Sequence, residues 1–443
     1  MSEKMKTVYK LILGLLFLFT ACDNDLDQVP PNIASADSLE DFTGVLNAAY
    51  FYQLGSVTPM AVMGDFRADN AFMFEAPFTE FDEFDADLPV MEDQFFGPFY
   101  TALYRSILSS NNVIENATIS TQIGEAKFLR ALSYFKLVQV FGDVTVNLSD
   151  APAVDDPSIL VRQSAADVYN NVIIPDLQDA IASLDNSGLS SGRATRIAAQ
   201  SLLGKVYVHQ GNFGAAATEL SSVVSGASAA GIELQADFAT IFGVDNDLNP
   251  EIIFATQVSS SIVDEYGFSE FWSWSGGLDT KSLEPLDLDL VAAFDASEAG
   301  GDTDLRRAVT IDETLLASPK FPQTGGPDHD WIEMRLADVI LLYAEALNEN
   351  GSTPAALIEL NKIRTRAGLS NSTAVTQAEV RQAIQDERRL ELAFEGQRWF
   401  DLVRTGTVDA EMGQAVNPNY YLFPVPISEV LASGGVITQN PGY

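Results

Sequence analysis

The stretch LGKVY at residues 203–207 reappears in altered form as YAEAL at residues 343–347. Beyond the small residue of each stretch, Gly204 or Ala344, apolar side chains recur at the same offsets. After Gly204 they are Tyr207, Ala216, Leu220 and Val223, and after Ala344 they are Leu347, Ala356, Leu360 and Ile363. These offsets match tetratricopeptide helix pairs, in which a small residue lets the first helix approach the second. Gly211 and Gly351 stand where the turns within the two pairs are expected.

Helical periodicity predicts two more pairs nearer the N-terminus. Residues 125–141 (EAKFLRALSYFKLVQVF) form a helix whose expected partner, residues 165–184, follows after a loop that contains prolines. Residues 103–119 are expected to pair with residues 42–54. Stacked pairs share one core, so several are needed together. We therefore predict a mostly α-helical fold on about four tetratricopeptide-like pairs, with long irregular loops and minor β structure at residues 251–257.

Two long stretches between the helices lack this periodicity. Residues 60–98 and 226–330 contain many Asp, Gly, Pro and aromatic residues. Stretches too long to be simple connectors commonly carry function. We expect them to be ligand-binding insertions in a single body, residues 36–443.

The N-terminus has the layout of a lipoprotein signal. Lysines precede an apolar run at residues 11–19, which is too short to cross a bilayer core of about 30 Å as a helix. Small residues lead to Cys22, the only cysteine, so residues 1–21 are expected to be removed and Cys22 to be lipidated. An ordinary cleavage site beside a chance cysteine is the alternative. Residues 22–35 are predicted to be an acidic tether, either to the cell surface or within the periplasm.

Charge and composition exclude several classes of function. The 443 residues include 62 acidic and 25 basic side chains, a formal net charge of −37, and no basic run. Nucleic-acid binding through phosphate contacts is therefore excluded, and direct adhesion to an anionic membrane is disfavoured. One cysteine forbids an internal disulfide, and two histidines make a multi-histidine zinc site hard to build.

No cofactor or metal site is expected, with one alternative left open. Residues 245–249 (DNDLN) place oxygen ligands at alternate positions, but Pro250 stands where an EF-hand needs glycine. A structural calcium ion at the surface stays possible, whereas an EF-hand is not supported.

Two aromatic clusters in the long stretches are candidate glycan sites. Sugar rings are bound by flat apolar side chains flanked by hydrogen-bonding groups. Residues 268–277 (FSEFWSWSGG) contain Trp272 and Trp274, whose indoles would share one side of an extended segment. In residues 65–74 (DFRADNAFMF) the candidates are Phe66, Asn70, Phe72 and Phe74. The alternative for both clusters is that the rings attach the loops to the body.

Five groups of motifs, in a fixed order, carry a resemblance to a known family. They are 125–131 (EAKFLRA) with 141–144 (FGDV), 249–254 (NPEIIF), 335–338 (RLAD) with 343–346 (YAEA), 387–404 (ERRLELAFEGQRWFDLVR), and 423–426 (FPVP) with 439–443 (QNPGY). Together with the lipoprotein start, they make the chain resemble the SusD/RagB family. These are surface lipoproteins that capture nutrients for SusC-like TonB-dependent transporters in Bacteroidetes. The resemblance runs nearly from end to end.

The residues of the 387–404 motif indicate a structural role. Acids and arginines alternate with apolar residues at helical spacing, which predicts ion pairs such as Glu387 with Arg389, within or between helices. Partly buried Arg and Glu must be paired to be tolerated. Trp399 and Phe400 are expected to hold this segment on the body.

The resemblance implies a protein without catalysis, lipid-anchored at the cell surface of the outer membrane. Its partners would be a glycan ligand and a SusC-like TonB-dependent transporter that receives it. A peptide-capturing, RagB-like lipoprotein is the nearest alternative. A surface glycoside hydrolase is less favoured; it needs only two carboxylates, and acids are too abundant here to be informative. A purely structural repeat adaptor is the third.

Overall fold

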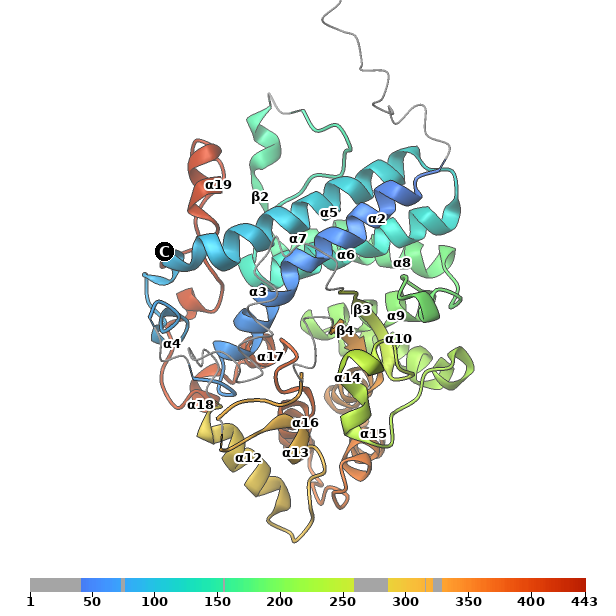
Figure 1. Ribbon diagram of the computed structural model, residues 1–443, viewed down its shortest axis with the longest axis vertical. Helices are drawn as coiled ribbons and strands as arrows, with labels where there is room; N and C mark the ends of the chain where they lie inside the picture. The colour runs from blue at the N-terminus through green and yellow to red at the C-terminus, as the bar shows by residue number, and fades with distance from the viewer. Residues whose placement is uncertain (1–40, 73–75, 154–155, 259–285, 315, 322–328) are drawn as a thin grey trace, which may run out of the picture. The chain divides into compact units, whose positions relative to one another are not determined.

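Helices packed on their neighbours in chain order make up most of the described chain (Figure 1). The structure is a computed structural model that describes residues 41–72, 76–153, 156–258, 286–314, 316–321 and 329–443. Residues Phe42–Tyr443 form one unit by their contacts. The predicted signal peptide, Cys22 and the tether at 22–35 lie outside the described residues.

The main helices follow the predicted periodic segments closely. They are α2 (Thr43–Tyr52), α5 (Gly97–Asn116), α6 (Ser120–Phe141), α8 (Ile174–Ser183), α9 (Arg196–His209), α10 (Phe213–Gly226), α14 (Leu336–Glu349), α15 (Thr353–Arg366), α16 (Gln377–Leu392) and α17 (Arg398–Thr405). Shorter helices are α3 (Val57–Ala61), α4 (Glu80–Glu83), α7 (Ala165–Val168), α12 (Leu288–Glu298), α13 (Arg307–Thr310), α18 (Val408–Glu411) and α19 (Ile427–Ala432).

The predicted helix-pair scaffold is confirmed. In the described residues, α2 packs on α5, α6 on α8, α9 on α10, and α14 on α15, and successive pairs contact one another. Figure 1 shows α2, α5 and α6 side by side, with the later pairs following. The predicted mostly helical fold with minor β structure is therefore correct.

The α9–α10 pair shows why a small residue is needed. A methyl group on Gly204 would lie 2.3 Å from Leu220 Cδ2, so the two helices approach too closely for any side chain there. Gly211 closes the turn between them with φ of +70°, a conformation that favours glycine. Thr195 and Asn212 cap the two helices by accepting from Ala198 N and Ala215 N.

Two short antiparallel sheets complete the described fold. The expected strand at 251–257 is β3 (Ile252–Thr256), and it pairs with β4 (Trp331–Arg335). The sequence did not indicate β4, because a five-residue strand that runs directly into α14 has too few positions to show alternation. The second sheet joins β1 (Val144–Thr145) to β2 (Arg162–Gln163).

The two long stretches are more ordered than the sequence suggested. Residues 57–66 form α3 and η4 (Val62–Phe66), and these residues are buried throughout. The second stretch contains α12, which is capped by the Asp287 side chain accepting from Asp289 N at 2.8 Å. The expectation of irregular loops is thus wrong for these parts, because burial against the body stabilises helical turns whose sequences are too short to show periodicity.

A buried ionic network joins the C-terminal helices to the sheet. Its carboxylates belong to Glu251, Asp304, Glu387, Glu391 and Glu395, and its cations to Arg306, Lys320, Arg335, Arg364 and Arg366. At its centre, Arg335 Nη1 lies 2.5 Å from Glu391 and 2.8 Å from Glu251. Such groups remain ionised in the interior only because each is paired.

The expected pair of Glu387 with Arg389 does not form. Glu387 instead contacts Arg306 at 2.7 Å and Arg364 at 3.0 Å, while Arg389 faces Asp69. Residues two positions apart on a helix point in different directions, so the partners come from other elements. Trp399 and Phe400 are buried as expected. No helix among the described residues combines the length and apolar character needed to cross a membrane.

Candidate functional site

The two stretches singled out from the sequence meet at Ala71. Ala71 forms an isolated antiparallel bridge with Leu286, and Asp287 N donates to Asn70 O at 3.2 Å. The segment that carries Phe72 therefore lies against residues 286–287 of the second stretch, which follow the tryptophans in the sequence. Phe72, the next residue after the bridge, has 52% of its surface exposed. Trp272, Trp274 and Phe74 lie outside the described residues.

Ion pairs from α16 and α17 fix the backbone just before Phe72. Arg398 Nε and Nη2 each lie 2.7 Å from one carboxylate oxygen of Asp69. Arg389 Nε donates to Asn70 Oδ1 at 3.1 Å, and its Nη2 donates to Asp69 O at 2.5 Å. Burial would raise the pKa of Asp69, but the bonds and charge of Arg398, with the charge of Arg389, hold it below the usual value.

Phe66 and Asn70 lie in the interior rather than at this surface. Phe66 is 1% exposed, and Asn70 is fully buried with its amide donating to Asp65 Oδ1 at 3.1 Å. In the described structure, the two side chains therefore attach the segment to the body, which is the alternative that the sequence left open. Phe72 is the candidate among the described residues whose ring is accessible to a ligand.

Asp65 attaches the same segment to the chain just after α16 through two backbone hydrogen bonds. Its Oδ1 accepts from Phe394 N at 3.1 Å and its Oδ2 accepts from Gly396 N. Gly64 and Gly396 lie so close that a methyl group on Gly64 would be 2.2 Å from Gly396 O. Burial raises the pKa of Asp65 to about 6, against the effect of these hydrogen bonds.

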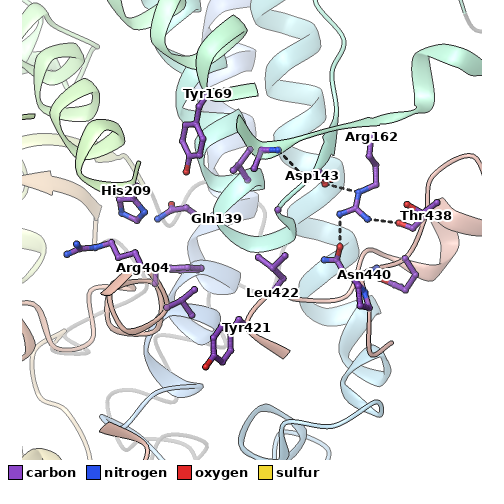
Figure 2. A pocket seen from close by; sticks show the side chains of 17 residues that line it. Gln139, Asp143, Arg162, Tyr169, His209, Arg404, Tyr421, Leu422, Thr438 and Asn440 are labelled. Atoms are coloured by element: carbon purple, nitrogen blue, oxygen red, sulfur yellow. Dashed lines mark hydrogen bonds between the residues drawn. The ribbon is translucent and has the colours of Figure 1, made fainter. Parts of the chain in front are cut away.

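Apart from the surface around Phe72, a pocket lies between α6, α9, α17 and the C-terminal tail (Figure 2). Its volume is about 690 Å³, within the usual range for small-molecule pockets, about 300–1,000 Å³. The lining mixes polar and apolar side chains; the residues are Val138, Gln139, Gly142, Asp143, Arg162, Ala165, Tyr169, His209, Phe400, Val403, Arg404, Tyr421, Leu422, Thr438, Gln439, Asn440 and Pro441.

The C-terminal tail forms one wall of this pocket. Asn440 Nδ2 donates to Phe141 O at 3.0 Å and to Phe423 O at 2.7 Å. Arg162 Nη1 donates to Thr438 O at 2.8 Å, and its Nη2 donates to Asn440 Oδ1 at 2.6 Å. The FGDV and QNPGY motifs thus meet here. Neither motif indicated a binding site in the sequence, because residues 141–144 and 439–443 are brought together only by folding.

Several side chains of residues 245–249, where a surface calcium ion stayed possible, make hydrogen bonds within the chain. Asn246 Nδ2 donates to Phe242 O at 2.7 Å, and Asn249 Nδ2 donates to Ile241 O at 3.0 Å. Asp247 Oδ1 accepts from Asp330 N at 3.2 Å. Elsewhere in the described chain, carboxylates of Glu80, Glu83 and Asp85 lie within 4.8 Å of one another on a largely exposed turn. Exposed acidic groups of this kind are common without an ion.

Comparison with known proteins identifies the family. The profile described as "SusD family" matches residues 307–420, and the profile described as "Starch-binding associating with outer membrane" matches residues 17–208. The chain belongs to the SusD family. The first profile covers Arg389 and Arg398, and the second covers Phe72, so the exposed ring and the arginines that fix its segment lie within the matched residues.

Individual members of the SusD family match over most of their length. SusD-like protein P2 of Formosa agariphila is 26% identical, covering 98% of this chain and 99% of that protein. Starch-binding protein SusD of Bacteroides thetaiotaomicron is 23% identical, covering 77% of this chain and 76% of that protein. The structure of surface glycan-binding protein A from Bacteroides fluxus aligns with a TM-score of 0.74 at 22% identity, covering 91% of this chain and 99% of that one. The last comparison shows a common fold.

Proposed function

We propose that this protein is a non-enzymatic glycan-binding lipoprotein of the cell surface. It captures an oligosaccharide or polysaccharide and hands it to a SusC-like TonB-dependent transporter. Support comes from relatives named for starch and surface-glycan binding, and from the profile whose description associates its members with the outer membrane. The lipidation of Cys22 and the transporter partnership are part of the proposal.

The exposure of Phe72 is the observation that carries this function. An exposed aromatic ring offers a flat apolar face on which the apolar face of a sugar can stack. Here the preceding residues Asp69 and Asn70 are fixed by Arg398 and Arg389, and Ala71 is paired with Leu286. A preorganised ring loses little entropy when a sugar stacks on it.

The proposal assigns the remaining stacking contacts to the adjoining stretches. Phe74 follows Phe72 by two positions, and Trp272 and Trp274 precede Leu286, the partner of Ala71, in the second stretch. Apolar faces of sugar rings would lie on these side chains. Neutral glycans are favoured over highly anionic ones because the chain carries a formal net charge of −37.

Native affinity electrophoresis tests the proposal. Protein from Asp23 onward is run through gels that contain neutral and charged polysaccharides, beside Phe72→Ala, Trp272→Ala and Trp274→Ala. We expect one neutral glycan to retard the protein, and each substitution to reduce the retardation. Phe51→Ala is the matched control, since Phe51 is a 37% exposed ring on α2. Its loss should leave retardation unchanged.

Other outcomes separate the competing functions. Retardation by no glycan, together with binding of peptides, would replace the glycan by a peptide cargo. Release of shorter sugars from the retarding polysaccharide, abolished by replacing one carboxylate, would establish a hydrolase instead.

A further inference from the structure

Three polar side chains face the pocket of Figure 2 with their hydrogen-bonding capacity unused. They are Gln139 near the end of α6, Tyr169 at the start of η8 (Tyr169–Ile173), and His209 at the end of α9. Within the described structure, none of the three makes a side-chain hydrogen bond to the protein. Buried or half-buried polar groups are normally paired, so a concentration of unused ones in one cavity indicates a polar occupant.

The charged groups of the pocket are already engaged with the protein. Arg162 donates to the carbonyl oxygens of Asp143, Phe141 and Thr438. Arg404 pairs with Glu345 through Nη2 at 2.8 Å and with Asp401 through Nε at 2.8 Å. The pocket therefore presents no unpaired cation for an anionic ligand.

The one carboxylate in the lining is also used. Asp143 Oδ1 accepts from Ala165 N at 2.9 Å, at the start of α7. A cationic ligand would therefore have to compete with a backbone hydrogen bond. Because the arginines and the carboxylate already have partners, the hydrogen-bonding groups that remain for a ligand are uncharged.

The imidazole of His209 is neutral near pH 7. Burial lowers its pKa well below the usual value, and the nearby charges of Arg404 and Lys205 lower it further. A neutral imidazole has one donor and one acceptor nitrogen. The Gln139 amide and the Tyr169 hydroxyl also both donate and accept. Hydroxyl groups of a sugar have the same dual character, so they match all three.

Part of the lining suits the apolar face of such a ring. Phe400 and Val403 contribute apolar surface to the lining, and Figure 2 shows Tyr421 and Leu422 on the side of the pocket away from Tyr169. Phe135 holds His209 in place by an edge contact with 5.1 Å between ring centroids. One apolar wall and one wall of neutral donors and acceptors is the arrangement expected for a polyhydroxylated ring.

We propose that the pocket between α6, η8, α9 and α17 is a second binding site, which takes one neutral sugar unit. None of its lining residues belongs to the Phe72 surface, so this site goes beyond the proposed capture function and is independent of the cargo bound there. The two are joined through α17, which presents Arg398 to Asp69 and Phe400, Val403 and Arg404 to the pocket.

The imidazole of His209 supplies a direct probe, because the chain has only two histidines. Side-chain ¹H–¹⁵N spectra of the mature chain are recorded with D-glucose, D-galactose, D-mannose or N-acetyl-D-glucosamine, and with D-glucuronate and D-glucosamine as charged comparators. The signal absent from His209→Gln identifies His209. We expect at least one neutral sugar to shift this signal saturably, with Kd of about 1 mM or below, and the charged sugars to bind at least about 10-fold more weakly.

Substitutions in the lining test whether the shift of the His209 signal comes from binding in the pocket. Tyr169→Phe removes one hydroxyl and should weaken binding about 3- to 10-fold. Ala165→Trp places a large side chain in the lining and should abolish the shift while leaving the His209 signal present. Tyr207→Phe, a tyrosine of α9 outside the lining, is the control and should bind normally.

The proposal is overturned if no neutral sugar shifts the His209 signal. It is also overturned if the shift survives Ala165→Trp, or if D-glucuronate binds as well as the neutral sugars. Electrophoretic capture that depends on Phe72 would be unaffected by these results, so failure of this site and failure of the capture function are distinguishable.

Discussion

Asp69 and Arg398 lie 329 positions apart in the sequence and form a two-point ion pair, with both nitrogen–oxygen distances at 2.7 Å. The pair joins the beginning of the body to its C-terminal motif. Planar guanidinium and carboxylate groups in this geometry fix orientation as well as distance. The pair therefore sets the direction in which the chain leaves toward Phe72.

Asp69→Asn should weaken both stability and glycan capture. The substitution removes one of the two carboxylate partners of Arg398, while Glu411 remains at 2.8 Å, so we expect a loss of about 1–3 kcal/mol. Urea unfolding at pH 7 measures the loss, and affinity electrophoresis below the transition measures capture. The control is Asp179→Asn, because the exposed pair of Asp179 with Lys127 should contribute at most about 1 kcal/mol. Equal stability of the two variants would contradict this role for the pair.

Glu391→Gln should be destabilising at neutral pH and much less so in acid. Burial alone would raise the pKa of Glu391, but Arg366, Arg335 and Arg306 hold it far below the ordinary value. The group binds its proton more readily in the unfolded chain, so its contribution is complete above about pH 4.5 and is lost as the pH falls further. We expect a loss of about 3–5 kcal/mol at pH 7.

Urea unfolding at pH 7, 5, 4 and 3 checks this dependence. The difference between wild type and Glu391→Gln should be constant from pH 7 to 5 and shrink below that. Glu313→Gln serves as the control, since the Glu313 pair with Arg307 is exposed and should contribute little at any pH. A difference that stayed constant to pH 3 would show that Glu391 is not held ionised.

The scaffold was predictable because its determinants are local. Small and apolar residues at fixed offsets from Gly204 and Ala344 define helix faces, and the structure places both stretches in α9 and α14 as expected. Strand β3 was also visible as a short apolar run. Its partner β4 was missed, because the pairing of Thr256 with Trp331 is decided by contacts across 75 positions and not by the pattern of either segment.

The sites were less predictable for the same reason. Arg389 could be expected to need a buried partner, yet Asp69 as that partner follows only from the folded chain. The pocket gathers Gln139, His209 and Asn440, whose positions in the sequence share no spacing. Aromatic composition drew attention to the segment around Phe72, but which ring faces outward depends on the turn that buries Phe66.

Asp65 should give the opposite pH dependence to Glu391. Burial raises its pKa to about 6, so the folded protein binds the proton more readily than the unfolded chain between about pH 4 and 6. The contribution to stability is present below about pH 4, declines as the pH rises to 6 and is then constant. A shift of this size corresponds to roughly 3 kcal/mol.

Asp65→Asn isolates this group, because the amide does not titrate. Unfolding free energies of wild type and variant are compared between pH 4 and 7, and the wild type should lose stability relative to the variant across pH 4 to 6. Asp295→Asn, at an exposed pair with Arg307, is the control and should run parallel to the wild type. Parallel curves for Asp65→Asn as well would mean that Asp65 is ionised throughout.

Gly204→Ala and Gly214→Ala should change stability in opposite directions, although both add one methyl group to a helix. In α9 the new methyl would meet Leu220 at 2.3 Å, and Leu220 is itself fully buried, so the pair must move apart at a cost of about 1–3 kcal/mol. At Gly214 in α10 the nearest atom is 4.0 Å away, so the higher helix propensity of alanine should stabilise by up to about 1 kcal/mol. Thermal and urea unfolding of the two variants measure the contrast. Stabilisation by both substitutions would show that the first and second helices of this pair are not in the close contact that defines the repeat.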